Sequence, residues 1–172
     1  VHLAARDTRQ IEEGVIQNEF DFGFVGGHLA GNEVDVIPWL TDQIVLVIAS
    51  KHRLAQKKSV KPHDLRKEKF IIGEPGSATR AAILTHLQKR DVEMNTIMEM
   101  ENPESVKKAV QSGLGIAFIS KFAVETELKA KTLVKVHVRG LDIQRELKIV
   151  FRKDKHLGRA AQAFIEIART SL

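Results

Sequence analysis

The sequence has no cysteine and no tyrosine among its 172 residues. Without cysteine, disulfide bonds, thiolate catalysis and cysteine-ligated zinc sites are excluded. The seven histidines include no pair four residues apart, so a metal site on one helix face is not expected. The longest apolar run, "IVLVIA" (44–49), is too short to cross a bilayer. No basic segment followed by an apolar stretch opens the chain, which fits an intracellular setting.

What is present is the composition of a folded domain, with 43% hydrophobic and 28% charged residues. The length allows one large domain or two small ones. The net charge of +5, from 27 basic and 22 acidic residues, could favour anionic ligands or simply aid solubility. The densest basic stretch (51–69) lacks the aromatic residues of a single-strand nucleic-acid binder, so we expect a solvated surface there.

Apolar periodicity predicts alternating strands and helices, which defines the α/β class. Residues 1–5 read as a buried strand, 7–20 as a helix and 21–27 as a second strand, the pattern of a parallel strand–helix–strand unit. Pro38 is expected to separate two extended segments, the second of which is continuously apolar and buried in a sheet. Further strands are predicted at 69–73, 95–100, 116–120, 132–138 and 145–153, and further helices at about 79–90, 103–112, 121–130 and 157–172.

Three predicted helices begin with polar residues directly after a strand, at Asp7-Thr8, at Ser77-Ala78-Thr79 and at 102–105. A helix start exposes unpaired N–H groups and a partial positive charge, so it can hold an anion. In parallel α/β sheets these starts lie at the carboxyl ends of the strands, where ligands bind. Each start alone is explained by helix capping, but three together favour an anion-binding cleft.

The same residues give no case for catalysis. His86 is the nearest histidine to Ser77 but follows two turns later on the same predicted helix, so it cannot activate the hydroxyl. No "GxSxG" elbow and no carboxylate pair is evident. The loop "GFVGGHLAG" (23–31) fits neither nucleotide-binding pattern. In it, Gly26 allows a tight exit from the strand, and His28 either reaches the cleft or lies on a surface loop.

Four segments in order resemble the effector-binding domain of LysR-type transcriptional regulators. Residues 1–27 are similar to that family's strand–helix unit ending in "D-φ-G-φ", where φ is apolar, and "LTDQIVLVIASKHRLA" (40–55) to its "L-x-x-D" segment ending in "H-P-L-A". "GSATR" (76–80) matches the loop that opens a cleft helix, and 104–120 matches "φ-x-x-G-x-G-φ-x-φ-φ-P". Arg53 and Ser120 depart from the family, which often has proline at both positions.

The resemblance implies two Rossmann-like subdomains joined by crossover strands, similar to type 2 periplasmic binding proteins, with a small effector in the cleft. Subdomain I would combine residues 1–41 and 142–172, and subdomain II would be 42–141. The effector would be a small anion, such as a carboxylate or an inorganic oxyanion, bound without metal or cofactor. The expected effector-binding residues are Thr8, Ser77, Thr79 and Arg80, with Ser50 and Ser105 as weaker candidates beside Gly26 and His28.

The family also carries a winged helix-turn-helix, a linker helix and a first strand and helix of subdomain I, all of which would precede Val1. DNA binding would therefore belong to the missing domain of a cytoplasmic, dimeric or tetrameric regulator. The piece in hand could bind effector weakly, assemble abnormally or expose a sheet edge. Two alternatives stay open: a solute-binding protein of a transport system and, less favoured, a small two-lobed enzyme acting on anions.

Overall fold

The computed structural model describes residues 2–170, which form two compact units. Unit 1 takes the described residues of Val1–Thr41 and Glu146–Leu172, and unit 2 is Asp42–Arg145. Two long strands, β2 (Val34–Ala49) and β7 (Ile143–Arg152), contribute residues to both units. Between residues 2 and 170, no helix combines the length and the apolar character required to span a bilayer.

Unit 2 is built on a mixed sheet. Strands β3 (Lys69–Gly73) and β4 (Asn95–Met100) pair in parallel, as predicted for a strand–helix–strand unit. A parallel bridge between Phe70 and Ile116 joins β3 to the strand beside it. That strand, β5 (Ala117–Ser120), pairs antiparallel with β2, and β6 (Leu133–Val136) pairs antiparallel with the other side of β2.

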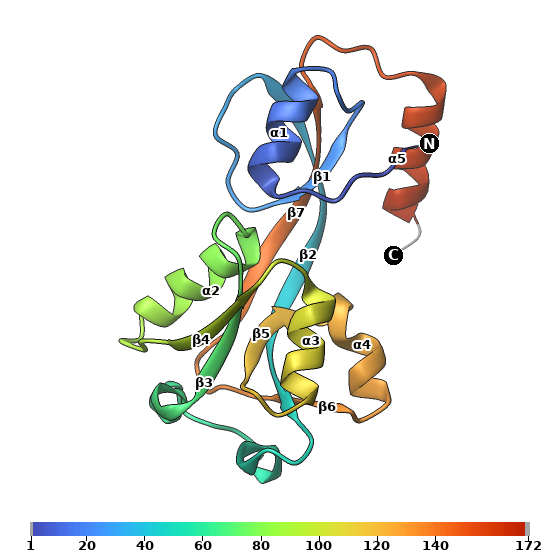
Figure 1. Cartoon of the computed structure of the whole chain (residues 1–172). Coiled ribbons are helices and arrows are strands. Elements are labelled where there is room, and N and C mark those ends of the chain that lie inside the picture. The colour runs from blue at the N-terminus through green and yellow to red at the C-terminus, as the bar shows by residue number, and fades with distance from the viewer. Residues whose placement is uncertain (1, 171–172) are drawn as a thin grey trace. The chain divides into compact units, whose positions relative to one another are not determined.

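Helices cover both faces of this sheet, α2 on one side and α3 with α4 on the other (Figure 1). Side chains of β2 alternate accordingly, with Leu46 and Ile48 in the core beneath α2 and Val45 and Val47 in the core beneath α3 and α4. Burial on both faces explains why the sequence of β2 is continuously apolar. The helices are α2 (Ala78–Gln88), α3 (Pro103–Gln111) and α4 (Lys121–Lys129), and two short 3₁₀ turns lie at Arg53–Gln56 and Pro62–Lys67.

Unit 1 has a smaller core. Strand β1 (Gly23–Gly26) pairs antiparallel with β7, and alternate side chains again face opposite ways. Val25 packs in an apolar cluster with α1, whereas Phe24 packs against Trp39 and Phe164. Trp39 Nε1 donates a hydrogen bond of 2.8 Å to the carbonyl of Ala168, which fastens α5 to this aromatic group. The helices of this unit are α1 (Thr8–Ile16) and α5 (Arg159–Thr170).

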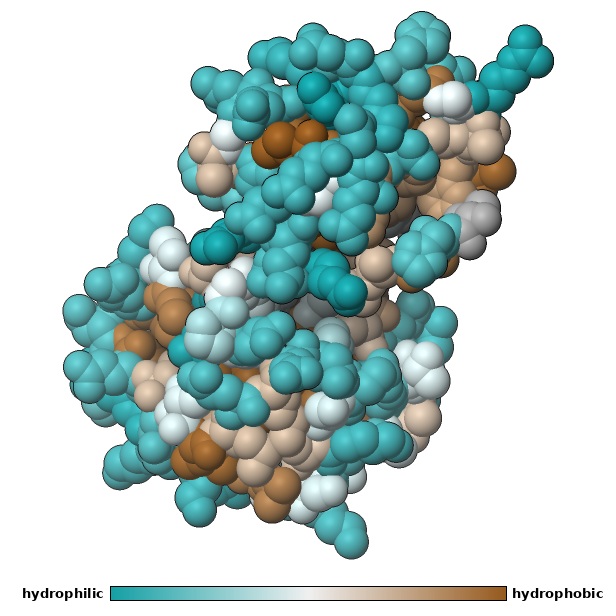
Figure 2. Space-filling model, turned by 45° about the horizontal axis from the view of Figure 1, so that its top comes forward, coloured by the Kyte–Doolittle hydropathy of each residue, from teal (hydrophilic) through white to brown (hydrophobic). Residues whose placement is uncertain are grey.

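Hydrophilic residues cover most of the face drawn in Figure 2, and hydrophobic residues appear there in separate groups. Among the exposed large apolar side chains are Phe122, 54% exposed, and Ile167, 63% exposed. Most other apolar side chains lie in the cores of the two units.

The predicted strand at residues 1–5 is wrong for the residues described. Residues 2–5 have no regular structure, and Leu3 is 78% exposed; residue 1 lies outside the described part. No strand of the described chain pairs with this segment, and an apolar composition makes a strand only where a partner accepts its hydrogen bonds. The predicted parallel unit over residues 1–27 is therefore absent there, and β1 pairs antiparallel with β7 instead.

The predicted interruption at Pro38 is also wrong, because β2 runs through it as one strand of 16 residues. Proline lacks the N–H that a ladder requires, so it interrupts a strand only where that donor has to be used. The pairs of β2 with β5 and β6 begin at Ile44, beyond the proline.

Candidate functional site

An open pocket lies within unit 2, at the carboxyl ends of β3, β4 and β5. Each of these strands leads into a helix, and the N-cap residues of all three helices line the pocket: Ser77 of α2, Asn102 of α3 and Ser120 of α4. Apolar side chains supply the remaining wall, among them Met100, Val106, Phe118 and Ile119.

The three helix starts differ in how their N–H groups are satisfied. Asn102 Oδ1 accepts the N–H of Ser105 at 2.9 Å, which is a well-formed cap. Ser77 Oγ accepts the N–H of Arg80 at 3.4 Å, a long bond that holds the donor weakly. Ser120 makes no side-chain cap bond to α4. The first N–H groups of α4, and partly those of α2, therefore remain free to bind water or an anion.

A buried carboxylate organises one side of the pocket. Asp42 is fully buried, and its Oδ1 accepts a hydrogen bond of 2.9 Å from the hydroxyl of Ser120. Its Oδ2 accepts 2.9 Å bonds from Nε and Nη2 of Arg145, which also lines the pocket. A buried carboxylate needs such partners, since an unpaired one would cost several kcal/mol. Asp42 thereby fixes the orientation of two groups that face the pocket.

Two of the predicted site residues, Ser77 and Thr79, line this pocket. Arg80 does not, because its Nη1 lies 2.7 Å from Glu99 Oε1 and donates a 3.0 Å bond to the carbonyl of Gly73. These contacts tie the start of α2 to the ends of β3 and β4. Arg80 thus stabilises the wall of the pocket through these contacts without lining it.

The two weaker candidates of unit 2 lie elsewhere. Ser105 is the third residue of α3, where its N–H is capped by Asn102, and it is not among the residues that line the pocket. Ser50 is exposed at the end of β2, whereas Ile44 of that strand pairs with Ser120 beside the pocket. At about 3.3 Å per residue, Ser50 lies about 20 Å along the strand from Ile44.

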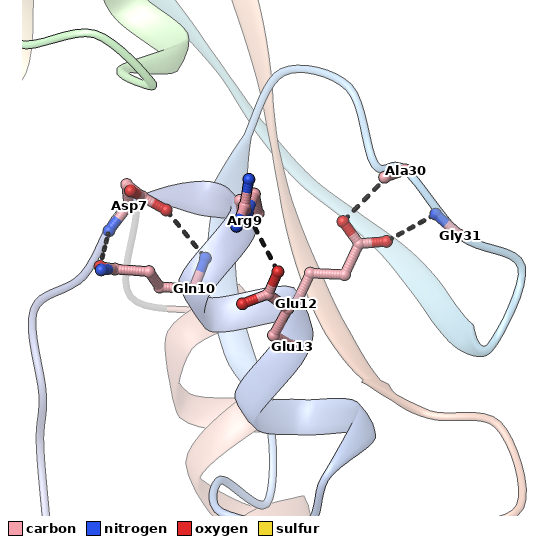
Figure 3. Close-up of polar contacts among 7 residues, drawn as sticks. All are labelled: Asp7, Arg9, Gln10, Glu12, Glu13, Ala30 and Gly31. Carbon is pink, nitrogen blue, oxygen red and sulfur yellow. Dashed lines mark hydrogen bonds and ion pairs between the residues drawn. The ribbon is translucent and has the colours of Figure 1, made fainter.

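The remaining predicted residues gather in unit 1. The hydroxyl of Thr8, at the start of α1, donates a 2.8 Å bond to the carbonyl of Gly26, the last residue of β1. Asp7 is the N-cap of α1, as Figure 3 shows, and its carboxylate accepts the N–H of Gln10 at 2.8 Å. His28 is exposed in the loop that follows. The helix start at Thr8 therefore belongs to a different unit from the starts that form the pocket.

A further buried carboxylate orders the loop after β1. Glu12 of α1 is 4% exposed, and its two oxygens accept the N–H groups of Ala30 and Gly31 at 3.0 and 2.8 Å (Figure 3). Both oxygens are satisfied, so Glu12 has a structural role. It holds the loop that carries His28 against α1.

Sequence reasoning did not identify Asp42 and Arg145 as site residues. Asp42 carried a signal, since a carboxylate between two apolar segments predicts burial and hence a cationic partner. Nothing in the sequence distinguished Arg145, because its strand also contains other charged residues. Only folding brings residues 42 and 145 together. The sequence singled out Ser120 only because the family that the chain resembles often has proline at this position.

The pocket is equipped to hold a ligand by hydrogen bonds. Of the residues that line it, only Glu101 and Arg145 carry a formal charge, and no histidine is among them to activate a hydroxyl. No group of three histidine, aspartate or glutamate side chains within residues 2–170 could hold a metal ion.

Comparison with known proteins places these features in context. The whole chain, residues 1–172, matches the family model of the LysR substrate binding domain. It is 31% identical over 171 residues to a probable RuBisCO transcriptional regulator of Synechocystis sp., covering 96% of this chain and 50% of that protein. The chain thus spans about half the length of the curated relatives that it matches.

Solved structures share the fold. The regulatory domain of CcmR from Synechocystis PCC6803, in complex with 2-PG, superposes with a TM-score of 0.86 at 24% identity, covering 96% of this chain and 79% of that one. The effector-binding domain of QuiR in complex with shikimate gives 0.84 at 17% identity, with 96% and 78% covered. These likenesses confirm the predicted α/β fold of the periplasmic-binding-protein type.

Proposed function

Since the chain belongs to the LysR substrate-binding domain family, we propose that it is the small-molecule sensing domain of a transcriptional regulator. The observation that carries the proposal is the pocket of unit 2, where three helix N-caps meet beside Arg145. DNA would be bound by a winged helix-turn-helix in the half of such regulators that this chain does not match. The full-length protein would act in the cytoplasm as a dimer or tetramer.

The ligand would be a small anion. Helix N-termini carry a partial positive charge, and Arg145 adds N–H donors to the lining of the pocket. CcmR was solved with 2-PG and QuiR with shikimate, and by extension this chain would bind a carboxylate or an oxyanion of similar size. Ser77 and Thr79 would contact it directly, without a metal or cofactor.

Unit 1 would contribute through Thr8, Gly26 and His28, which share one corner of that unit. Arg80 and Ser105 would act through the helix starts that they stabilise. Ser50 has no support from the structure and is left out of the proposed site. The two units would correspond to the regulatory subdomains, and effector binding would change the DNA-binding state by favouring one arrangement of them.

Sensing accounts for the pocket better than turnover does. The hydroxyls of Ser77, Thr79 and Ser120 have no neighbouring base among the residues that line the pocket. The relative described above is a probable transcriptional regulator and the CcmR structure is a regulatory domain, which favours this role over solute transport.

The test is a thermal melting series with phosphate, sulfate, shikimate and 2-PG against chloride at equal ionic strength. A bound anion stabilises the folded state by mass action, so at least one should raise the Tm by several degrees. Thr79→Val should abolish that rise. Thr85→Val is the matched control, because Thr85 lies on the same helix outside the pocket lining and its hydroxyl donates to the carbonyl of Ala81. No rise with any of the four anions would overturn the proposal, and a full rise in Thr79→Val would overturn the role of Thr79.

A further inference from the structure

We propose that the pocket selects a small anion bearing a hydroxyl group next to its charged group, with Arg145 binding the anionic oxygen and Ser120 accepting from the hydroxyl. This inference rests on the proposed sensing function and specifies its ligand class. It follows from the hydrogen-bond directions that Asp42 imposes on its two partners.

Asp42 can only accept. It is fully buried on β2, and a carboxylate in its ionised form has acceptor oxygens and no proton to donate. Both oxygens are in use, one for Ser120 and the other for Arg145. Ser120 and Arg145 must therefore each direct an O–H or N–H group at Asp42. Only the lone pairs and N–H groups that they do not use for Asp42 are available to a ligand in the pocket.

Ser120 is turned into an acceptor by this arrangement. A serine hydroxyl has one proton and two lone pairs. The proton is committed to Asp42 Oδ1 at 2.9 Å. No cap bond to α4 uses the lone pairs. Ser120 therefore offers the pocket an oxygen that accepts and cannot donate, which suits a ligand hydroxyl and disfavours a bare carboxylate oxygen.

Arg145 presents the complementary group. Its Nε and Nη2 bond to Asp42 Oδ2, and no bond from Nη1 is formed within the part of the chain that the structure describes. The side chain is 19% exposed and lines the pocket. The unused N–H groups of Nη1 suit an anionic oxygen, and such charge-assisted bonds are stronger than neutral ones.

The spacing of the two groups allows one compact ligand to reach both. Both bonds end on the same carboxylate, so Ser120 Oγ and the Arg145 guanidinium lie at most about 8 Å apart, two hydrogen bonds plus the carboxylate width. A hydroxyl on the carbon next to a carboxylate spans a similar distance once its own two hydrogen bonds are added. Asp42 is thus a positioning residue that sets the order of acceptor and donor without touching the ligand.

The experiment compares lactate with propionate, which differ by one hydroxyl on the carbon next to the carboxylate. Both are titrated into the ¹⁵N-labelled chain, and affinities are read from amide shifts. Lactate should bind about three- to tenfold more tightly, the value of one added neutral hydrogen bond. Ser120→Ala should bring the ratio close to one. Ser112→Ala, whose hydroxyl bonds to the carbonyl of Lys108 at the far end of α3, should keep the ratio.

Asp42→Asn gives a second readout. An amide presents a donor where the carboxylate had only acceptors, so one partner of Asp42 has to reverse or break its bond. The preference for lactate should then fall although Ser120 is still present. Asp42→Asn with an unchanged ratio would overturn the positioning role of Asp42.

The outcomes separate the two proposals. Equal binding of lactate and propionate to the unmodified chain, or a preference retained in Ser120→Ala, would overturn this inference and leave anion sensing in place. Binding of neither acid, together with no response to phosphate, sulfate, shikimate or 2-PG, would overturn the sensing function and this inference with it.

Discussion

Lys107 Nζ lies 2.9 Å from Glu127 Oε1, and this ion pair joins α3 to α4. The same nitrogen lies 2.7 Å from Glu104 Oε1 and donates a 2.9 Å bond to the carbonyl of Ala123. The Lys107 side chain is only 7% exposed, and each of its three protons has an acceptor. Because α3 and α4 both begin at the pocket, this contact fixes two of its helix starts.

Lys107→Met is expected to lower the free energy of unfolding by about 3 kcal/mol, because it leaves the largely buried carboxylate of Glu127 without its cation. Urea unfolding measures the change. Lys129→Met is the matched control, since Lys129 pairs with Glu125 on the exposed face of α4 and such pairs contribute less than about 1 kcal/mol. Similar losses in both variants would show that the buried contact has no special weight.

The pH dependence of this contact follows from two pKa changes. The hydrogen bond from Lys107 lowers the pKa of Glu127 below its ordinary 4.5. Burial opposes the charged form of Lys107, but its bonds to Glu104 and Glu127 outweigh that and raise its pKa above 10.5. The stabilisation is therefore present between these two ordinary values. It is lost as the pH falls through the lowered pKa of Glu127 or rises through the raised pKa of Lys107.

Glu127→Gln tests that dependence. Its free energy of unfolding should lie below that of the unmodified chain by a constant amount between about pH 5 and pH 10, and the gap should narrow below that window. Urea titrations at about pH 7 and pH 3 measure it. A gap that widens on acidification would contradict the assignment.

Gly115 is expected to tolerate no side chain. A Cβ at this position would lie 2.6 Å from the carbonyl oxygen of Lys69, where β3 adjoins the strand that contains Ile116. Gly115→Ala should destabilise the chain by about 1–3 kcal/mol, the usual cost of overpacking. Gly158→Ala has open space around it and should be close to neutral. Thermal melting distinguishes the two variants, and equal Tm values would contradict the close approach.

The two helix caps at the pocket should respond differently to alanine. Asn102→Ala removes a 2.9 Å cap bond and should cost about 1 kcal/mol, whereas the 3.4 Å bond of Ser77 is weaker and Ser77→Ala should cost less. If Ser77 contacts the anion, Ser77→Ala should nevertheless reduce the anion-induced rise in Tm. Melting curves with and without phosphate give both quantities. A small stability loss with a full anion response would limit Ser77 to capping.

The elements that local chemistry specifies could be read from the sequence. The caps at Asp7, Ser77 and Asn102 occur where predicted, and Gly113 ends α3 with a φ of 77°. Such features depend on residues within one turn of each other. The strands at 69–73 and 95–100 and the helix between them were predicted, and β3 and β4 pair in parallel, as this order of elements favours.

Expectation and structure differ where a residue's position depends on a distant partner. An apolar segment at residues 2–5 has the composition of a strand but finds no neighbour in the described chain. Arg80 looked like an anion ligand until its contact with Glu99 on another strand was known. Ser50 was a weaker candidate implied by the family resemblance, whereas the part of β2 beside the pocket is decided by its pairing with β5.

The sequence by itself determined the α/β class, the helix caps and the resemblance to a regulator family, because these depend on periodicity and on short-range hydrogen bonds. Tertiary structure alone decided that Ser120 lines the same pocket as Ser77 and Asn102. It also decided that Asp42, 103 residues before Arg145 in the chain, directs the groups which that pocket presents. Such pairings result from the packing of a whole sheet, and no local pattern in the sequence encodes them.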